Sequence, residues 1–366
     1  YQYRLLMLRY LLARGWNRIG EELGVCDGHR IDQFFATGDA AHLDRAPIYG
    51  FKGDARTDRT DAPTGLLSDS YAANYPAKEL AVEQKAFAKS LRQLANERVH
   101  FFGFDIDGSP GGGYADIAEM FEPYVDDAAI SEIAARLARV ADESVDAEAA
   151  RLDAALNLID VARQRLSDLT GAASASKIAH QARALRDSFR YIQMAFPAAT
   201  WPALKTAMAF RETVMHRNVE DALAEAGPSG KIALMSHNLH LAKDYGRVKG
   251  SIGAGPGGGK VDAVGTHIAK LMPGEVYSVW MLCNRGRDCQ PFSFCTCEIK
   301  PVAGSINPIL ASIASALVLP LDSLENAYFA DAELLIQMDG NTGVRTPIAR
   351  QADAIVFIDE VSPLKL

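Results

Sequence analysis

The chain has 366 residues, a formal net charge of −8 and a sequence pI of about 5.6. This acidic balance, without a dense run of lysine and arginine, excludes the basic face that is typical of nucleic-acid-binding proteins. The longest apolar run, at residues 309–321, is too short to cross a bilayer and contains Pro320, so no membrane attachment is expected. With 48% apolar and 23% charged residues, the chain has the composition of a globular protein of one or two domains.

The start of the chain and its cysteines bear on its compartment. The sequence opens at Tyr1 without a methionine, inside a predicted helix, so we expect upstream residues to be missing; no signal peptide is recognisable. Five cysteines are an odd number, which favours a reducing compartment, and we predict a cytoplasmic protein. Four of them lie between 283 and 297 with a spacing that is not typical of a zinc ribbon or finger, so strand thiols are favoured over zinc.

Apolar periodicity and turn residues predict the elements in chain order. A helix at 3–14 comes first, followed by a strand at 16–23 and a helix at 27–37. The segment 38–76 is rich in Gly, Asp and Pro and predicts a long irregular excursion, which inside a compact domain is more often functional than idle. The later predicted elements are helix 77–96, strand 98–106, helix 115–121, strand 231–236, helix 264–271, strand 276–283, helix 309–319, strand 333–338 and strand 354–359.

A long block of helical pattern separates the early strands from the late ones. Within it Ile130, Ile133 and Leu137 recur at helical spacing, and turn residues are few. The expected organisation is 1–126 as the N-terminal part of an α/β core, 127–226 as a helical insertion and 227–366 as the C-terminal part of the core. Because strands alternate with helices outside the insertion, the expected fold class is α/β, a three-layer α/β/α arrangement with a mostly parallel sheet.

Ionisable residues gather where three of the predicted strands end. These groups are Glu21-Glu22, Asp105-x-Asp107 and His237-Asn-x-His240. Because the carboxyl ends of parallel strands border the ligand crevice of an α/β fold, we expect the three groups to converge at one edge of the sheet. A carboxylate beside an imidazole can activate a water, since one group takes the proton while the other orients it or stabilises its charge.

Each of these groups also has an interpretation without catalysis. Glu21 and Glu22 point to opposite faces of a strand, so at most one faces the crevice and the other is expected to pair with an arginine. Asp105 could cap the loop that follows it, and His240 could donate to a carbonyl in the core. The Ser-His-Asn-x-His stretch could be a helix cap with two incidental histidines. Two further strands with ionisable ends favour the functional interpretation.

The absence of several familiar motifs narrows the reaction class. The glycine runs at 111–113 and 255–259 match neither a P-loop nor the dinucleotide fingerprint, so they predict flexible loops. No Gly-x-Ser-x-Gly elbow and no His-Glu-x-x-His occur in the sequence, which argues against a serine α/β-hydrolase and against a zincin protease. Catalysis is therefore expected to use water directly, without a serine acyl-enzyme, and no cofactor is expected.

Segments spread over most of the chain together resemble the erythromycin esterase family. The His-Asn-x-His element and the upstream Arg/Met/Asn helix are the most specific of them. The segments are Arg18-Ile-Gly-Glu-Glu-Leu23, Phe102-Gly-Phe-Asp105, Arg211-Glu-x-x-Met-x-x-Asn218, Lys231-Ile-x-Leu-x-x-His-Asn-x-His240, Gly265-Thr-His-Ile268, Val276-Tyr-Ser-Val279 and Asp353-Ala-Ile-Val-Phe-Ile-Asp-Glu360.

The resemblance implies an α/β/α sandwich with a helical insertion, and hydrolysis of macrolide lactones by water without a metal. It also implies the site residues. The catalytic residues would be Glu22 and His237, with Arg4 as an assisting arginine, and the candidate substrate-binding residues are His240, Asn238, His267 and Asp105.

One family motif is not found in this sequence. The family carries Gly-Glu-x-x-His just before the helix that here begins near Tyr1, and that motif supplies its principal general-base histidine. We expect the motif to lie upstream of residue 1; the alternative is a relative without catalytic activity.

The predicted function is hydrolysis of a carboxylic ester or lactone, with a polyketide-like or acyl small molecule as substrate. The helical insertion and the segment 38–76 would wall a deep apolar cleft for it. One alternative is a biosynthetic acyl transferase or cyclase that uses the same site, and another is a binding protein with an inactive site. A third is a metal-dependent hydrolase that uses His237, His240 and a carboxylate. The sequence carries no signal for an oligomeric state.

Overall fold

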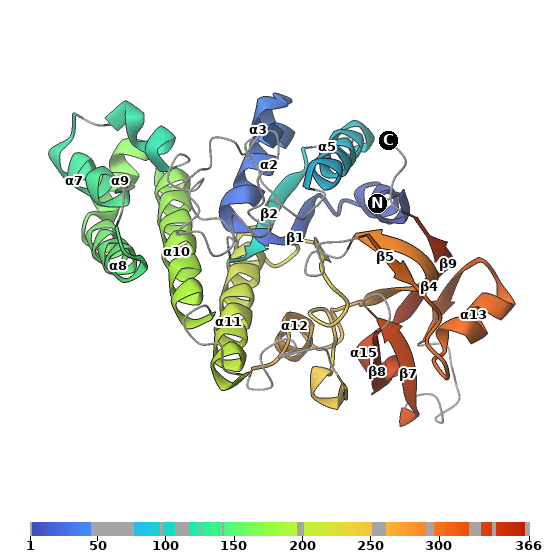
Figure 1. The fold of residues 1–366 in the computed structure, drawn as a ribbon. Coiled ribbons are helices and arrows are strands. Elements are labelled where there is room, and N and C mark those ends of the chain that lie inside the picture. Colours follow the sequence, from blue (N-terminus) through green and yellow to red (C-terminus); the bar gives the residue numbers. More distant parts are fainter. Residues whose placement is uncertain are drawn as a thin grey trace. The chain divides into compact units, whose positions relative to one another are not determined.

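The computed structural model describes residues 2–44, 77–95, 98–106, 117–124, 126–138, 140, 143–195, 201–250, 261–289, 296–321, 331–338 and 342–362. These residues form two compact units. The first contains the described residues up to 195, together with 217–235, and the second contains 201–216 and the described residues from 236 onward. Each unit is described by itself below (Figure 1).

The first unit combines a small sheet with many helices. Its elements are α1 (Gln2–Leu12), β1 (Arg18–Gly24), α2 (Val25–Thr37), α3 (Ala41–Asp44), α5 (Ala77–Leu94), β2 (His100–Asp105), η3 (Glu122–Tyr124), α7 (Ala128–Leu137), α8 (Val145–Val161), α9 (Arg163–Thr170), α10 (Ala172–Ala195), the second part of α11 (Trp201–Ala226) and β3 (Ile232–Met235).

The sheet of the first unit is parallel, with strand order β2-β1-β3. Ile19 of the central strand β1 lies beside Phe101 of β2 and Ala233 of β3, and it is fully buried. The three strands with ionisable ends are therefore neighbours in one parallel sheet, as the sequence predicts.

Helix α2 packs very closely on β2. A Cβ atom added to Gly28 would lie 1.9 Å from the backbone nitrogen of Gly103, and one added to Gly103 would lie 2.0 Å from the carbonyl oxygen of Gly24. Both positions therefore require glycine, because even an alanine would force the backbones apart. Close packing here fixes the place where β1 ends and α2 begins.

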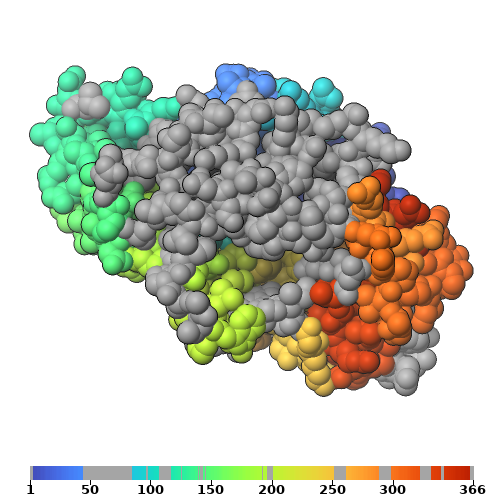
Figure 2. Space-filling view, in the orientation of Figure 1, coloured from blue at the N-terminus to red at the C-terminus, as the bar shows by residue number. Residues whose placement is uncertain are grey.

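The helices α7 to α10 enclose an apolar core. Ile130, Leu152 and Leu185 are completely buried in it, and Cys26 of α2 packs against the same core. Asp127 starts α7 by accepting the backbone N–H groups of Ala129 and Ile130. The helices lie side by side in Figure 1, and their side chains form the green surface in Figure 2. This helical region belongs to the same unit as β1 and β2.

The second unit is built mainly from strands. Its sheet has the order β5-β4-β9-β6, in which β4 and β9 are parallel and both edge strands are antiparallel; β7 and β8 form a separate antiparallel pair. Its elements are the first part of α11, η4 (Tyr245–Arg247), α12 (Val264–Leu271), β4 (Val279–Cys289), β5 (Thr296–Ile299), α13 (Asn307–Ile313), β6 (Ala316–Pro320), β7 (Glu333–Met338), β8 (Thr342–Pro347), α15 (Ile348–Gln351) and β9 (Ala354–Val361).

The α/β class and the large helical region are confirmed, and the prediction of a helix over 309–319 is wrong in part. Helix α13 ends at Ile313, and residues 316–320 form the edge strand β6 beside β9. A short apolar run does not distinguish a helix from a strand, and here pairing with β9 decides the outcome. The predicted segment boundaries at 126/127 and 226/227 stay predictions. The glycine runs and most of the excursion 38–76 lie outside the described residues.

No helix among the described residues combines the length and the apolar character that a membrane crossing demands.

Candidate active site

A buried carboxylate lies in the carboxyl-terminal half of β1. Glu21 is 8% exposed, and its Oε1 lies 3.6 Å from Nη1 of Arg4 on α1. The next residue, Glu22, is half-buried. The structure thus brings the predicted Arg4 to Glu21, which is the arginine pairing that the sequence predicts for one member of the Glu21-Glu22 pair.

The surroundings of Glu21 shift its pKa upward. Burial raises the pKa of Glu21, the positive charge of Arg4 lowers it in part, and the negative charge of Glu22 raises it further. A carboxyl group in a low-dielectric site binds its proton more tightly because the charged form loses solvation. Perturbed carboxyl groups of this kind are frequent at functional sites.

Asp105 ends the neighbouring strand β2. It lies beside Gly24 in the register of β1 and β2, and it is 6% exposed. One of its carboxylate oxygens accepts the backbone N–H of Ile106 at 2.8 Å, so Asp105 helps to terminate its own strand. The partner residue in the predicted motif, Asp107, lies outside the described residues.

The second unit holds the histidine segment that follows β3 in the chain. His237 is half-buried, and its Nδ1 accepts the backbone N–H of Leu239 at 3.2 Å. Asn238 pairs with the backbone of Met281 on β4: the amide nitrogen donates to the carbonyl oxygen at 2.8 Å and the amide oxygen accepts the N–H at 3.2 Å. These two bonds attach the segment to β4 and thereby fix the backbone that carries His237.

His240 is buried in a network that involves α11. Its Nδ1 lies 2.9 Å from Oε2 of Glu212, and its Nε2 lies 3.4 Å from Nη1 of Arg211. Sequence analysis assigned no role to Glu212. The available signal was a charged residue on the apolar stripe of a helix, because Met215 and Val219 share the buried face with it.

The predicted site residue His267 lies in the first turns of α12 and stacks on another imidazole. Its ring is parallel to that of His216, with centroids 4.1 Å apart and an interplanar angle of 5°. The pKa of His216 is lowered, first by burial and then by the positive charge that His267 can carry. The Nε2 of His216 donates to the carbonyl oxygen of Asp262 at 2.8 Å, which orients the ring.

Gly265 sets the position of α12 against the histidine segment. Its backbone N–H donates to the carbonyl oxygen of His240 at 2.7 Å, and an added Cβ atom would lie 2.3 Å from the carbonyl carbon of Leu241. Glycine at this position therefore lets α12 approach the segment that carries His240. The structure brings His237, Asn238, His240 and His267 into one unit, and Arg4, Glu21, Glu22 and Asp105 into the other.

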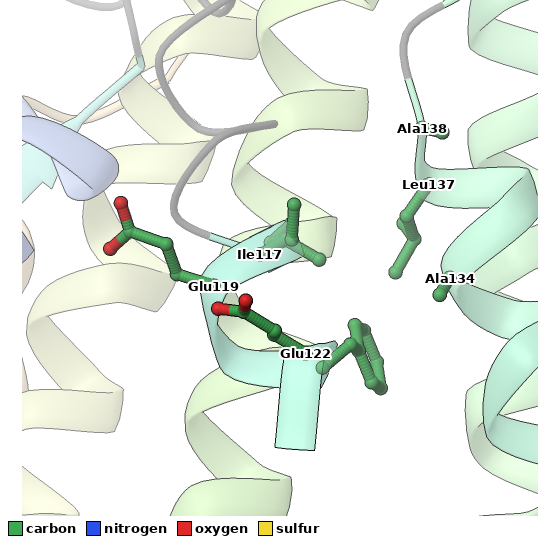
Figure 3. Close-up of a pocket in the computed structure, with 8 residues that line it drawn as sticks. Ile117, Glu119, Glu122, Ala134, Leu137 and Ala138 are labelled. Carbon is green, nitrogen blue, oxygen red and sulfur yellow. The ribbon is translucent and has the colours of Figure 1, made fainter. Parts of the chain in front are cut away.

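An apolar pocket of about 400 Å³ lies in the helical region of the first unit. Figure 3 shows Leu137 and Ile117 in its walls and two carboxylates, those of Glu119 and Glu122, among the lining residues. Glu119 also pairs with Arg30 at 3.0 Å. None of the predicted site residues lines this pocket. Within the described part of the chain, no group of three or more His, Cys, Asp or Glu side chains has the arrangement of a metal site.

The fold and the family follow from comparisons with known proteins. A succinoglycan biosynthesis protein matches with a TM-score of 0.60 and 15% identity, covering 98% of this chain and 84% of that one. A protein from Bacillus cereus matches with a TM-score of 0.62, 15% identity and the same coverage.

A third structure is that of a mutant of the erythromycin esterase EreC in its open conformation. It matches with a TM-score of 0.57 and 16% identity, and covers 98% of this chain and 87% of that one. A search of curated proteins found no match. The sequence model of the erythromycin esterase family matches residues 81–361, which include the histidine segment, α11 and α12. The chain therefore belongs to the erythromycin esterase family and, with it, to a family of hydrolases of small molecules.

Proposed function

We propose that the protein hydrolyses a carboxylic ester or lactone at the carboxyl ends of β1, β2 and β3. The observation that carries this proposal is the strand order β2-β1-β3: the carboxylates belong to β1 and β2, and His237 follows the last residue of β3 by two positions. Carboxyl ends of adjacent parallel strands are the usual location of ligand sites in α/β folds.

The proposed reaction needs a base and a group that stabilises the developing oxyanion. Water, activated by Glu22 together with His237, attacks the carbonyl carbon of the ester. The carboxylate takes a proton from the water, the carbon–oxygen bond to the alcohol breaks, and the proton passes to the leaving alkoxide. Arg4 or His267 would stabilise the oxyanion of the tetrahedral intermediate, a contribution that preorganised donors make in acyl transfer.

The ion pair between Arg4 and Glu21 supports different roles for the two carboxylates of β1. Glu21 is the buried carboxylate that holds Arg4, so its proposed role is to orient this arginine. The proposed role of Glu22 is to take the proton from the attacking water. In this scheme the substrate is a polyketide-like or acyl molecule, and the enzyme is cytoplasmic.

The test is a mass-spectrometric turnover assay with the full natural protein on macrolides, simple lactones and aryl esters. The expected product is heavier than its substrate by one water. Glu22→Gln and His237→Ala should each lower kcat by about 10²–10⁴-fold, the contribution of a positioned acid or base. Glu21→Gln is the matched variant, with a smaller expected loss because Arg4 keeps its charge.

The outcomes separate this proposal from its rivals. A product formed without addition of water would replace it by acyl transfer or cyclisation. Activity that is lost on chelation and restored by one divalent ion would replace it by metal-dependent hydrolysis. No product from any ester, with a folded protein by circular dichroism, would leave binding without turnover. A larger loss in Glu21→Gln than in Glu22→Gln would exchange the two proposed roles.

A further inference from the structure

The environment of Glu212 is that of a carboxylate whose position is fixed. It is completely buried on α11, its Oε1 accepts the backbone N–H of Val264 at 2.6 Å, and its Oε2 lies 2.9 Å from Nδ1 of His240. Val264 opens α12, so the carboxylate also lies at the positive end of that helix dipole. A buried charge is tolerated when it is paired and hydrogen-bonded in this way.

The partners of His240 determine which of its ring nitrogens carries the proton. A guanidinium group only donates hydrogen bonds, so Nε2, which faces Arg211 at 3.4 Å, is the acceptor. The proton of the neutral ring is therefore on Nδ1, which donates to the carboxylate of Glu212. Both contacts favour the same tautomer, because the other tautomer would turn a donor toward Arg211 and a ring nitrogen without a proton toward Glu212.

His237, three residues earlier in the chain, has the opposite arrangement. Its Nδ1 accepts the backbone N–H of Leu239, so the neutral ring carries its proton on Nε2. The two rings are nearly perpendicular, at 83°, with centroids 6.5 Å apart. Two histidines of one short segment are thus held as different tautomers by different means, a backbone N–H in one case and two charged side chains in the other.

We propose that Glu212 is a positioning residue which, together with Arg211, holds His240 as the Nδ1–H tautomer. This proposal rests on the proposed function and deepens it, because it assigns a positioning residue to His240, a candidate substrate-binding residue of the same proposed site. Glu212 itself touches no substrate; it acts through His240 and through the start of α12.

The position of Glu212 explains why it would affect the reaction rather than stability alone. The carbonyl oxygen of His240 accepts the N–H of Gly265, the residue after Val264. Glu212 therefore contacts the side chain of His240 and the first turn of α12 at the same time. A change of charge at Glu212 alters the orientation of His240 and of the helix that carries His267.

The first test reads the tautomers directly and needs no turnover. The full protein, labelled with ¹⁵N in its histidines, is examined near neutral pH by two-bond ¹H–¹⁵N correlation NMR, which identifies the protonated ring nitrogen. His237→Asn and His240→Asn each remove one signal set and assign the spectrum. The expected result is a proton on Nδ1 of His240 and on Nε2 of His237. A wild-type His240 with its proton on Nε2, or a doubly protonated His240, overturns the proposal.

The second test compares Glu212→Gln with Glu212→Asp and with Glu225→Gln. Glu225 is an exposed carboxylate on the same helix and serves as the control for loss of one charge. Glu212→Gln should remove the single-tautomer pattern of His240 and lower kcat about 10–100-fold with little change in KM, the range known for carboxylates behind metal-bound imidazoles. Glu212→Asp should restore the pattern and part of kcat.

The two proposals fail in different ways. An unchanged His240 pattern together with an unchanged kcat in Glu212→Gln refutes the positioning role. The expected wild-type tautomers in a protein that hydrolyses no ester support the positioning of the histidines and refute the proposed function. A loss of kcat in Glu212→Gln that equals the loss in Glu225→Gln reflects charge alone and contradicts the proposal.

Discussion

Glu21 and Glu212 are both buried carboxylates, but their surroundings differ. Glu212 receives two direct hydrogen bonds, from a backbone N–H and from an imidazole, at the start of a helix. Glu21 has Arg4 at 3.6 Å, beyond direct hydrogen-bond distance, and burial raises its pKa. The comparison teaches that burial alone does not define the role of a carboxylate. Hydrogen bonds hold Glu212 in place, whereas the charge of Arg4 offsets only part of the effect of burial on Glu21.

The largest expected effect on stability comes from removal of the carboxylate of Glu212. Glu212→Leu leaves the N–H of Val264 and the ring of His240 buried without an acceptor. We expect the free energy of unfolding to fall by about 3–5 kcal/mol, the usual cost of breaking a buried pair. Urea unfolding measures this loss, and a change below about 1 kcal/mol would show that Glu212 is not tightly coupled to its neighbours.

The next effect tests the backbone packing that supports Glu21. Gly28→Ala places a Cβ atom 1.9 Å from the backbone nitrogen of Gly103, so α2 and β2 have to separate. Overpacking of this kind costs about 1–3 kcal/mol. Thermal unfolding monitored by circular dichroism measures it. Gly15→Ala is unsuitable as a control because Gly15 has a φ of 79°, whereas Gly246→Ala meets only an oxygen of Asp244 at 4.0 Å and should be nearly neutral.

A smaller effect of opposite sign is expected at Glu21. A carboxyl group whose pKa is raised by folding binds more protons in the folded state than in the unfolded state. Stability therefore falls as the pH rises above the unfolded-state pKa near 4.5, and the folded protein carries this cost at neutral pH. Glu21→Gln removes the cost, so it should raise the melting temperature at pH 7. The gain should disappear as the pH falls to 4.5; a gain that is equal at both pH values contradicts this explanation.

The smallest effect is expected at the exposed carboxylate of α11. Glu225 lies 3.9 Å from Arg18, and its side chain is 66% exposed. Surface ion pairs contribute little, so Glu225→Gln should change the free energy of unfolding by less than about 0.5 kcal/mol. Chemical denaturation in low and high salt measures this. A larger change at low salt would show that the comparison between Glu21 and Glu212 has to include long-range charge effects.

The strands that carry the candidate site residues are found near the residues where the sequence predicts them. Short apolar runs followed by polar groups mark β2 and β3, and a strand that ends in Glu21-Glu22 marks β1. The alternation with helices predicts that the three strands are parallel neighbours. The helix α2 and the strand β7 are also found near the predicted residues. The resemblance to the erythromycin esterase family, carried by the His-Asn-x-His segment, is confirmed by the family match.

The contacts of the site could not be predicted from local pattern. Glu212 and His240 are 28 positions apart, and only the folded chain brings the carboxylate to the ring. The pairing of Arg4 with Glu21 rather than Glu22 depends on which face of β1 meets α1. The strand β6 depends in the same way on its pairing with β9. Long-range contacts decide these outcomes, and periodicity in the sequence carries no information about them.

The amide of Asn238 has a consequence for how this segment can change during evolution. Its side chain imitates a peptide unit, donating to and accepting from Met281 as a neighbouring strand would. A side-chain amide can form these two hydrogen bonds without placing its own backbone in the sheet. The segment is therefore attached to β4 although it does not continue the sheet as a strand. In a true strand a single added residue moves every following side chain to the other face of the sheet. Insertions and deletions on either side of the Asn238–Met281 contact should therefore reduce stability less than they would in a strand. Asn238→Asp would remove one of the two hydrogen bonds to β4, because a carboxylate has no donor for the carbonyl oxygen of Met281.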